Sequence, residues 1–191
     1  MTRLLATLAG LCLFLTTQAP AATAQQGQNN ALAVHMSHLL EGSAEWRSPN
    51  PDHQAGSANS PAQFGVNWRW GSNGQHLVGE VTGIYEDGRV ARYQSLYAFL
   101  NPVTDRVVTQ QVGWDGTFHA GDHVLRTEPL AAGDTENVDM IAFTPDGTAK
   151  ITRHRAEIID AETHRMDVYE RNETGEWTLL REWVWRLAEA D

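Results

Sequence analysis

The stretch from Thr163 to Leu187, THRMDVYERNETGEWTLLREWVWRL, contains a strand, a turn and a second strand. In the first strand, His164, Met166 and Val168 are two residues apart and therefore share one face. The turn Asn172-Glu173-Thr174-Gly175 follows. In the second strand a largely apolar face is formed by Trp177, Leu179, Arg181, Trp183, Trp185 and Leu187. This pattern predicts two antiparallel neighbours with one buried face.

The same alternation between short turns extends back to Phe64. Turns rich in Gly, Asn and Asp recur at residues 71–74, 86–88, 101–105, 115–116 and 145–147. Such spacing predicts an all-β meander of about ten strands. Because a long meander must protect its edge strands, we predict one closed, antiparallel, up-and-down β-barrel. Barrels of this size hold either packed side chains or one small ligand.

The first 24 residues have the features of a secretory signal peptide. Arg3 gives a positive start, Leu4 to Leu15 is almost entirely apolar, and Ala22-Thr23-Ala24 is a small-residue cleavage site before Gln25. The alternative is a membrane anchor, but the apolar run is too short to span a hydrocarbon core of about 30 Å. We therefore predict export, cleavage near Ala24, and a periplasmic or secreted protein.

The rest of the chain is expected to be one domain. Residues 25–31 form a polar leader that we predict to be disordered. Leu32 to Leu40 has the spacing of a short amphipathic helix that could cover one end of a barrel. Gly42 to Arg47 is the first predicted strand, Ser48 to Pro61 is a long loop, and the barrel domain spans 32–191.

Composition limits the chemistry and the partners. The single cysteine, Cys12, lies in the predicted signal peptide, so the mature protein would have neither a disulfide nor a thiol nucleophile. The net charge of −10 should repel nucleic acid and anionic lipid. We expect no nucleic-acid partner and no stable membrane insertion.

Aromatic residues on the strand faces are the first candidate ligand contacts. The chain has seven tryptophans. Those on predicted strand faces either line a cavity for a flat or apolar ligand, or fill the barrel. The candidate aromatic site residues are Trp68, Trp70, Tyr97, Trp114, Trp183 and Trp185.

Polar residues on otherwise apolar faces are the second set of candidates. Gln110 lies between Val108 and Val112, and Arg181 lies between Leu179 and Trp183. With His164 they form the predicted polar anchors. A buried arginine must be paired, so Arg181 would bind a ligand carboxylate or form an internal salt bridge.

The other histidines give weaker signals. His119 and His123 flank Ala120-Gly121-Asp122 and resemble metal ligands, but the Gly-Asp pair is typical of a solvated turn, and we predict no metal site. Haem ligation by His154 or His164 is the cofactor alternative. The chain contains no G-x-S-x-G, P-loop or H-E-x-x-H motif, and we assign no catalytic residue.

Several segments are similar to a known group of barrels. His38 to Trp46 resembles the opening helix and strand of calycin-like barrels, a group that includes lipocalins, fatty-acid-binding barrels and haem-binding nitrobindin-like barrels. Four further segments are similar to the bacterial DUF1579-like proteins: Trp68–Gly71, Tyr97–Asp105, Phe143–Gly147 and Trp177–Arg186. The resemblance implies a calycin-like barrel and no established activity, and it assigns no site residue.

Three functions remain open from the sequence. The first is an exported protein that binds a small apolar or amphipathic molecule among the candidate residues. The second is an enzyme or isomerase that uses the same cavity, with His164 as general base. The third is a structural or accessory domain with a solid core.

Overall fold

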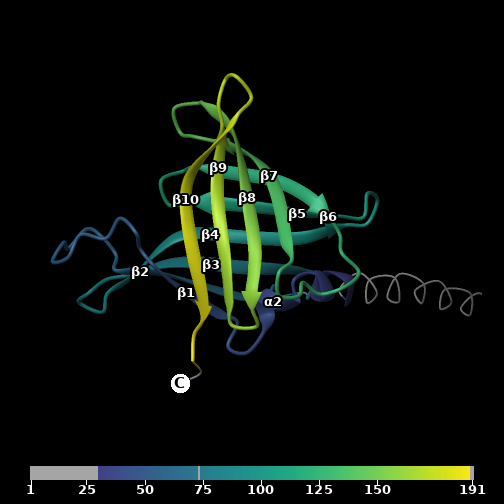
Figure 1. The fold of residues 1–191 in the computed structure, drawn as a ribbon, viewed down its shortest axis with the longest axis horizontal. Coiled ribbons are helices and arrows are strands. Elements are labelled where there is room, and N and C mark those ends of the chain that lie inside the picture. The colour runs from purple at the N-terminus through teal and green to yellow at the C-terminus, as the bar shows by residue number, and fades with distance from the viewer. Residues whose placement is uncertain (1–29, 73, 190–191) are drawn as a thin grey trace, which may run out of the picture.

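The computed structural model describes residues 30–72 and 74–189, and within these ranges the chain forms one closed antiparallel barrel of ten strands (Figure 1). The predicted fold class is confirmed. The predicted signal peptide and most of the leader lie outside the described residues. Among the residues described, no helix is both long enough and apolar enough to cross a membrane.

The strands follow the chain order and close where β1 pairs with β10. Their bounds are β1 Glu45–Pro49, β2 Gln63–Trp70, β3 His76–Ile84, β4 Val90–Asn101, β5 Arg106–Gly113, β6 Phe118–Val124, β7 Thr135–Phe143, β8 Ala149–Asp160, β9 Thr163–Arg171 and β10 Trp177–Leu187. Consecutive strands joined by short turns give this up-and-down order. Closure leaves no free edge in the sheet.

A helical segment covers one end of the barrel. Residues 30–35 are helical, so the helix already includes Asn30 and Ala31, which the sequence placed in the leader. After a break at Met36 the short helix α2 spans Ser37–Leu40. The indole N–H of Trp46 donates to the carbonyl oxygen of Leu39 at 3.3 Å, which joins the segment to β1.

Side chains pack closely around Leu32 of this segment at one end of the barrel. Its fully buried side chains include Leu32, Trp46, Leu77 and Val107, which come from the helix and from three strands. Burial of such side chains stabilises the fold by about 1.5–3 kcal/mol each. This packed layer closes one end of the barrel.

Strand β6 corrects a detail of the sequence interpretation. Gly121 does not break the strand, because it pairs with both Thr109 and Met140. A Cβ atom at this glycine would lie 2.3 Å from the carbonyl oxygen of Asp139, so the close approach of β7 explains why glycine is needed. His119 and His123 therefore lie on a strand, not beside a solvated turn.

Candidate functional site

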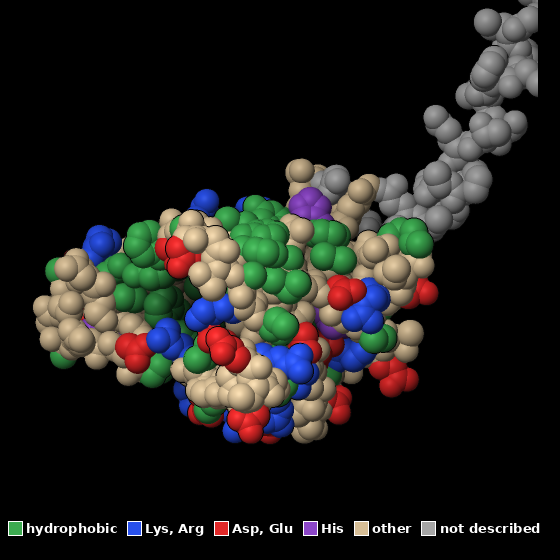
Figure 2. All heavy atoms as spheres, turned by 90° about the horizontal axis from the view of Figure 1, so that it is seen from above, with side chains coloured by type: hydrophobic (Ala, Val, Ile, Leu, Met, Phe, Trp, Pro, Cys, Tyr) green, Lys and Arg blue, Asp and Glu red, His purple; other side chains and the backbone are tan. Residues whose placement is uncertain are grey.

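The barrel contains a cavity of about 670 Å³ above the packed layer. Its lining includes Phe64, Trp68, Trp183 and Trp185, together with His154. Figure 2 shows apolar side chains in a shaded recess between the projecting segment on the left and the body of the barrel. The volume lies within the range of about 300–1,000 Å³ that is typical of small-molecule sites.

A smaller space of about 140 Å³ lies beneath the helical segment. Met36 and His38 cover it from the helical side, and Trp68, His154 and His164 line both spaces. The two spaces therefore adjoin. The interior is packed around Leu32 and contains both spaces farther along the barrel.

Histidines are concentrated inside the barrel. Of the eight in the chain, six lie in the interior or just beneath the helical segment: His35, His38, His119, His123, His154 and His164. They come from the helical segment, β6, β8 and β9.

Burial keeps these rings neutral. Desolvation lowers the pKa of His38 to about 3, with a smaller contribution from His164. It lowers the pKa of His154 and of His164 to about 4, and it also lowers the pKa of His119. The cavity therefore presents uncharged imidazoles, each of which can donate and accept a hydrogen bond.

His35 and His123 form a hydrogen-bonded pair whose tautomers can be worked out. The backbone N–H of Arg126 donates to Nδ1 of His35 at 3.1 Å, so the proton of the neutral His35 ring lies on Nε2. That Nε2–H donates to Nε2 of His123 across 2.7 Å, which places the proton of His123 on Nδ1. Burial, with a contribution from Arg126, lowers the pKa of His35 to about 3 and that of His123 to about 4.

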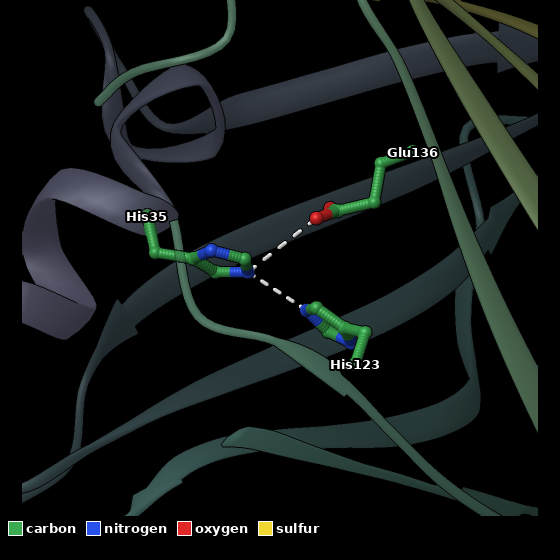
Figure 3. Close-up of side chains that lie close together, drawn as sticks. All are labelled: His35, His123 and Glu136. Atoms are coloured by element: carbon green, nitrogen blue, oxygen red, sulfur yellow. Dashed lines mark hydrogen bonds and ion pairs between the residues drawn. The ribbon is translucent and has the colours of Figure 1, made fainter. Parts of the chain in front are cut away.

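Glu136 completes this group, which we call the His35 cluster: His35, His123, Arg126 and Glu136. Oε1 of Glu136 lies 3.8 Å from Nε2 of His35 and 3.2 Å from Nε of Arg126. Figure 3 shows His35, His123 and Glu136 converging from separate elements. The pairing of β6 with β7 ends at Gly121 and Met140, and the cluster lies where the two strands diverge.

The cluster has the residue types of a metal site but not its hydrogen bonding. His35, His123 and Glu136 bring their ligand atoms within 4.8 Å of one another. A metal on Nε2 of His35 would require a proton on Nδ1, the atom that accepts the Arg126 N–H. Two nitrogens on one tetrahedral zinc would also lie roughly 3.3 Å apart, whereas these lie 2.7 Å apart. The guanidinium of Arg126 further disfavours a second cation.

The structure brings five of the predicted site residues to the cavity. Trp68, His164, Arg181, Trp183 and Trp185 line the larger space. Gln110 borders the smaller space, but it pairs with Tyr97 on the outer face, and its neighbour Gln111 is the inward residue. His164 is buried between aromatic rings, with centroids 4.6 Å from Trp46 and 6.5 Å from Trp185. The indole nitrogen of Trp185 is buried and has no hydrogen-bond partner among the described residues.

Three aromatic residues lie elsewhere. Trp70 packs in the core at the end of β2, opposite Leu77. Tyr97 lies on the outer face of β4, because its neighbours Leu96 and Ala98 are the buried ones. Trp114 is 74% exposed, because β5 ends one residue before it.

Arg181 lies at the mouth of the cavity, on the same face of β10 as Trp183 and Trp185. Its side chain is 43% exposed and forms an ion pair with Asp52 of the long loop. A β-bulge between Leu179 and Arg181 shifts the alternation of β10 at this point. The expectation that Arg181 is paired is met, but at the surface.

The sequence interpretation missed most of the interior histidines. His119 and His123 are four residues apart, which is the spacing of one strand face, but the Gly121-Asp122 pair was interpreted as a turn. His35 lies three residues after Leu32 on the predicted helix, a spacing that places both on one face. These two spacings were the available signals.

Comparisons with known proteins do not assign a family. No protein-family model matches the chain, and no curated protein matches it. The closed barrel supports a calycin-like fold. Membership of the DUF1579-like group stays a prediction from the segments quoted above.

Proposed function

We propose that the protein binds one small amphipathic molecule inside the barrel. The observation that carries the proposal is the 670 Å³ cavity, with indole rings and neutral imidazoles in the same lining. Aromatic side chains supply apolar contact area, and imidazoles supply the few polar groups that orient a ligand. A solid-cored structural domain would have no reason to retain such a space.

We also propose that the protein acts after export, as its predicted signal peptide implies. In that compartment the acidic domain would meet small molecules and would not have nucleic acid as a partner. Sequencing the N-terminus of the exported form tests this part, and an uncleaved Met1 on a membrane-bound form would contradict it.

Binding accounts for the site better than catalysis by His164 does. A general base works best when its pKa is near the working pH, whereas burial holds the pKa of His164 at about 4. Its ring contacts are with His38, Trp46 and Trp185, and in the described part of the chain no carboxylate orients it.

A fluorescent apolar ligand tests the proposal. N-phenyl-1-naphthylamine is uncharged and should bind with an increase in its emission. Val168→Trp would fill part of the cavity, so affinity should fall about tenfold or more. Val103→Trp is the matched control, since Val103 is exposed in a turn. Equal affinity in both variants would place the ligand outside the cavity and contradict the proposal.

A ligand screen then narrows the identity. Fatty acids, haem and aromatic metabolites can each be titrated while the emission of Trp68, Trp183 and Trp185 is followed, because these indoles line the cavity. Turnover of a bound compound that is lost in His164→Ala would instead favour the enzyme alternative.

A further inference from the structure

The cavity has two chemically different walls. In the ring of ten strands, β6 lies five places from β1 in either direction, so the two strands are opposite each other. The neighbours of β1, which are β10 and β2, supply the aromatic rings Trp183, Trp185 and Trp68. On the far side, β5, β6 and β8 supply Gln111, His119 and His154. One side of the cavity is therefore aromatic and the other is polar.

The hydrogen-bonding capacity of the polar wall is unused. Neither the His119 ring nor the His154 ring makes a hydrogen bond to another described protein group, and Nδ1 of His119 and Nε2 of His154 are buried without a partner. The two rings meet edge to face, with centroids 6.2 Å apart. The side-chain amide of Gln111 makes only a weak contact with the sulfur of Met140, at 3.8 Å. Since buried polar groups are nearly always paired, this wall indicates a polar partner.

Charge is confined to the mouth of the larger space. Arg181 is the charged residue of its lining, and Asp52 already neutralises it. Burial lowers the pKa of both wall histidines, so they bring no positive charge. An ion held deep in this space would lack a counter-ion, which is strongly unfavourable.

We infer that the ligand is an uncharged planar heteroaromatic molecule. Its ring face stacks on the wall of Trp68, Trp183 and Trp185, and its heteroatom edge hydrogen-bonds to His119 and His154. This inference rests on the proposed binding function and specifies its ligand class.

Two bicyclic compounds of nearly the same shape test it. Quinoxaline carries two ring nitrogens that accept hydrogen bonds, and naphthalene carries none. Equilibrium dialysis of the purified protein against each compound gives an affinity ratio for the wild type, for His119→Leu and for His154→Leu. Each substitution should reduce the affinity for quinoxaline relative to naphthalene by about tenfold. His53→Leu is the control, because His53 lies outside the cavity and pairs with Glu86.

The outcomes separate this inference from the proposed function. If the ratio of quinoxaline affinity to naphthalene affinity is the same in the wild type, His119→Leu, His154→Leu and His53→Leu, the polar-edge assignment is overturned. The cavity would still stand as a binding site. Tighter binding of quinoxaline-2-carboxylate than of quinoxaline would overturn the uncharged class. No binding of either bicycle, when N-phenyl-1-naphthylamine does bind, would also overturn the inference. Failure of that fluorescent ligand itself would remove the proposed function.

We expect His119→Leu and His154→Leu to fold normally, so that a change in affinity reports on the cavity. Within residues 30–72 and 74–189, His119 and His154 make no hydrogen bond that leucine would break, and replacing an unpaired buried polar group with an apolar one is nearly neutral or stabilising. Melting curves of both variants check this directly.

Discussion

Replacing His35 with leucine should destabilise the protein far more than the same change at His38. The ring of His35 is fully buried, accepts the backbone N–H of Arg126 and donates to His123. His35→Leu strands both of those partners, at about 1–3 kcal/mol each. After the apolar gain of leucine, the free energy of unfolding should fall by about 2–4 kcal/mol.

His38→Leu is the matched control on the same segment. The ring of His38 makes no hydrogen bond to a described protein group, although it is also withdrawn from solvent. Its replacement removes a poorly satisfied polar group, so the free energy of unfolding should change by less than about 1 kcal/mol. The comparison therefore isolates the hydrogen bonds of His35 from the general effect of an added leucine.

Urea unfolding followed by tryptophan emission measures both changes. Trp46 and Trp185 are buried in the native state and report loss of the barrel. The predicted difference corresponds to roughly 5–15 °C in melting temperature for a domain of this size. Equal effects of the two substitutions would refute the assignment of the His35 cluster as a structural hydrogen-bond network.

Three further predictions follow from the same contacts. The folded pKa values of His35 and His123, about 3 and 4, lie below the unfolded value of about 6.5, so stability should be lost as the pH falls from about 6.5 towards 3. Arg126 and Glu136 face this pair. The double variant His35→Leu/His123→Leu should flatten the curve of stability against pH, and an unchanged curve would contradict the assignment. Zn²⁺ should not raise the melting temperature, because the His35 ring cannot offer Nε2 while Nδ1 accepts a hydrogen bond; a clear rise that the His35 variant abolishes would show a metal site. Arg181→Met should change the free energy of unfolding by less than about 1 kcal/mol, because its ion pair with Asp52 is exposed; a loss of several kcal/mol in urea unfolding would show that the pair is buried.

The fold could be predicted because its turns are local signals. Each turn depends on a few residues such as Asp146-Gly147, and Gly147 has the positive φ of 85° that glycine adopts readily. The hydrophobic alternation of β2 is equally clear, and it placed Trp68 on the inner face. Turn positions and alternation together determine the number and order of the strands.

The candidate site was harder to predict because faces can be ambiguous. In β4 both alternations are apolar, since Leu96 and Ala98 compete with Tyr97 and Phe99. In β10 the bulge between Leu179 and Arg181 removes Leu179 from the face that Arg181 shares with Trp183 and Trp185. A bulge depends on the pairing with β9, which a single strand pattern does not contain.

The histidine-lined interior could not have been assembled from local patterns. Its rings come from elements far apart in sequence, such as His38 in α2, His119 in β6 and His154 in β8. Only closure of the barrel brings them around one space. Burial then removes their charge, an effect that depends on the complete enclosure.

The division between a packed layer and a hollow layer separates stability from binding. Leu32, Trp46 and Leu77 close the end beneath the helical segment without contributing to the larger space. His119 and His154 line the hollow end and make no hydrogen bond to a described protein group. Stability should therefore depend mainly on the packed end, and ligand choice on the hollow end. Changes such as His154→Leu should alter affinity while leaving unfolding nearly unchanged, whereas His35→Leu should do the reverse. If both substitutions affected both properties, the two layers would be coupled and the interior would act as one unit.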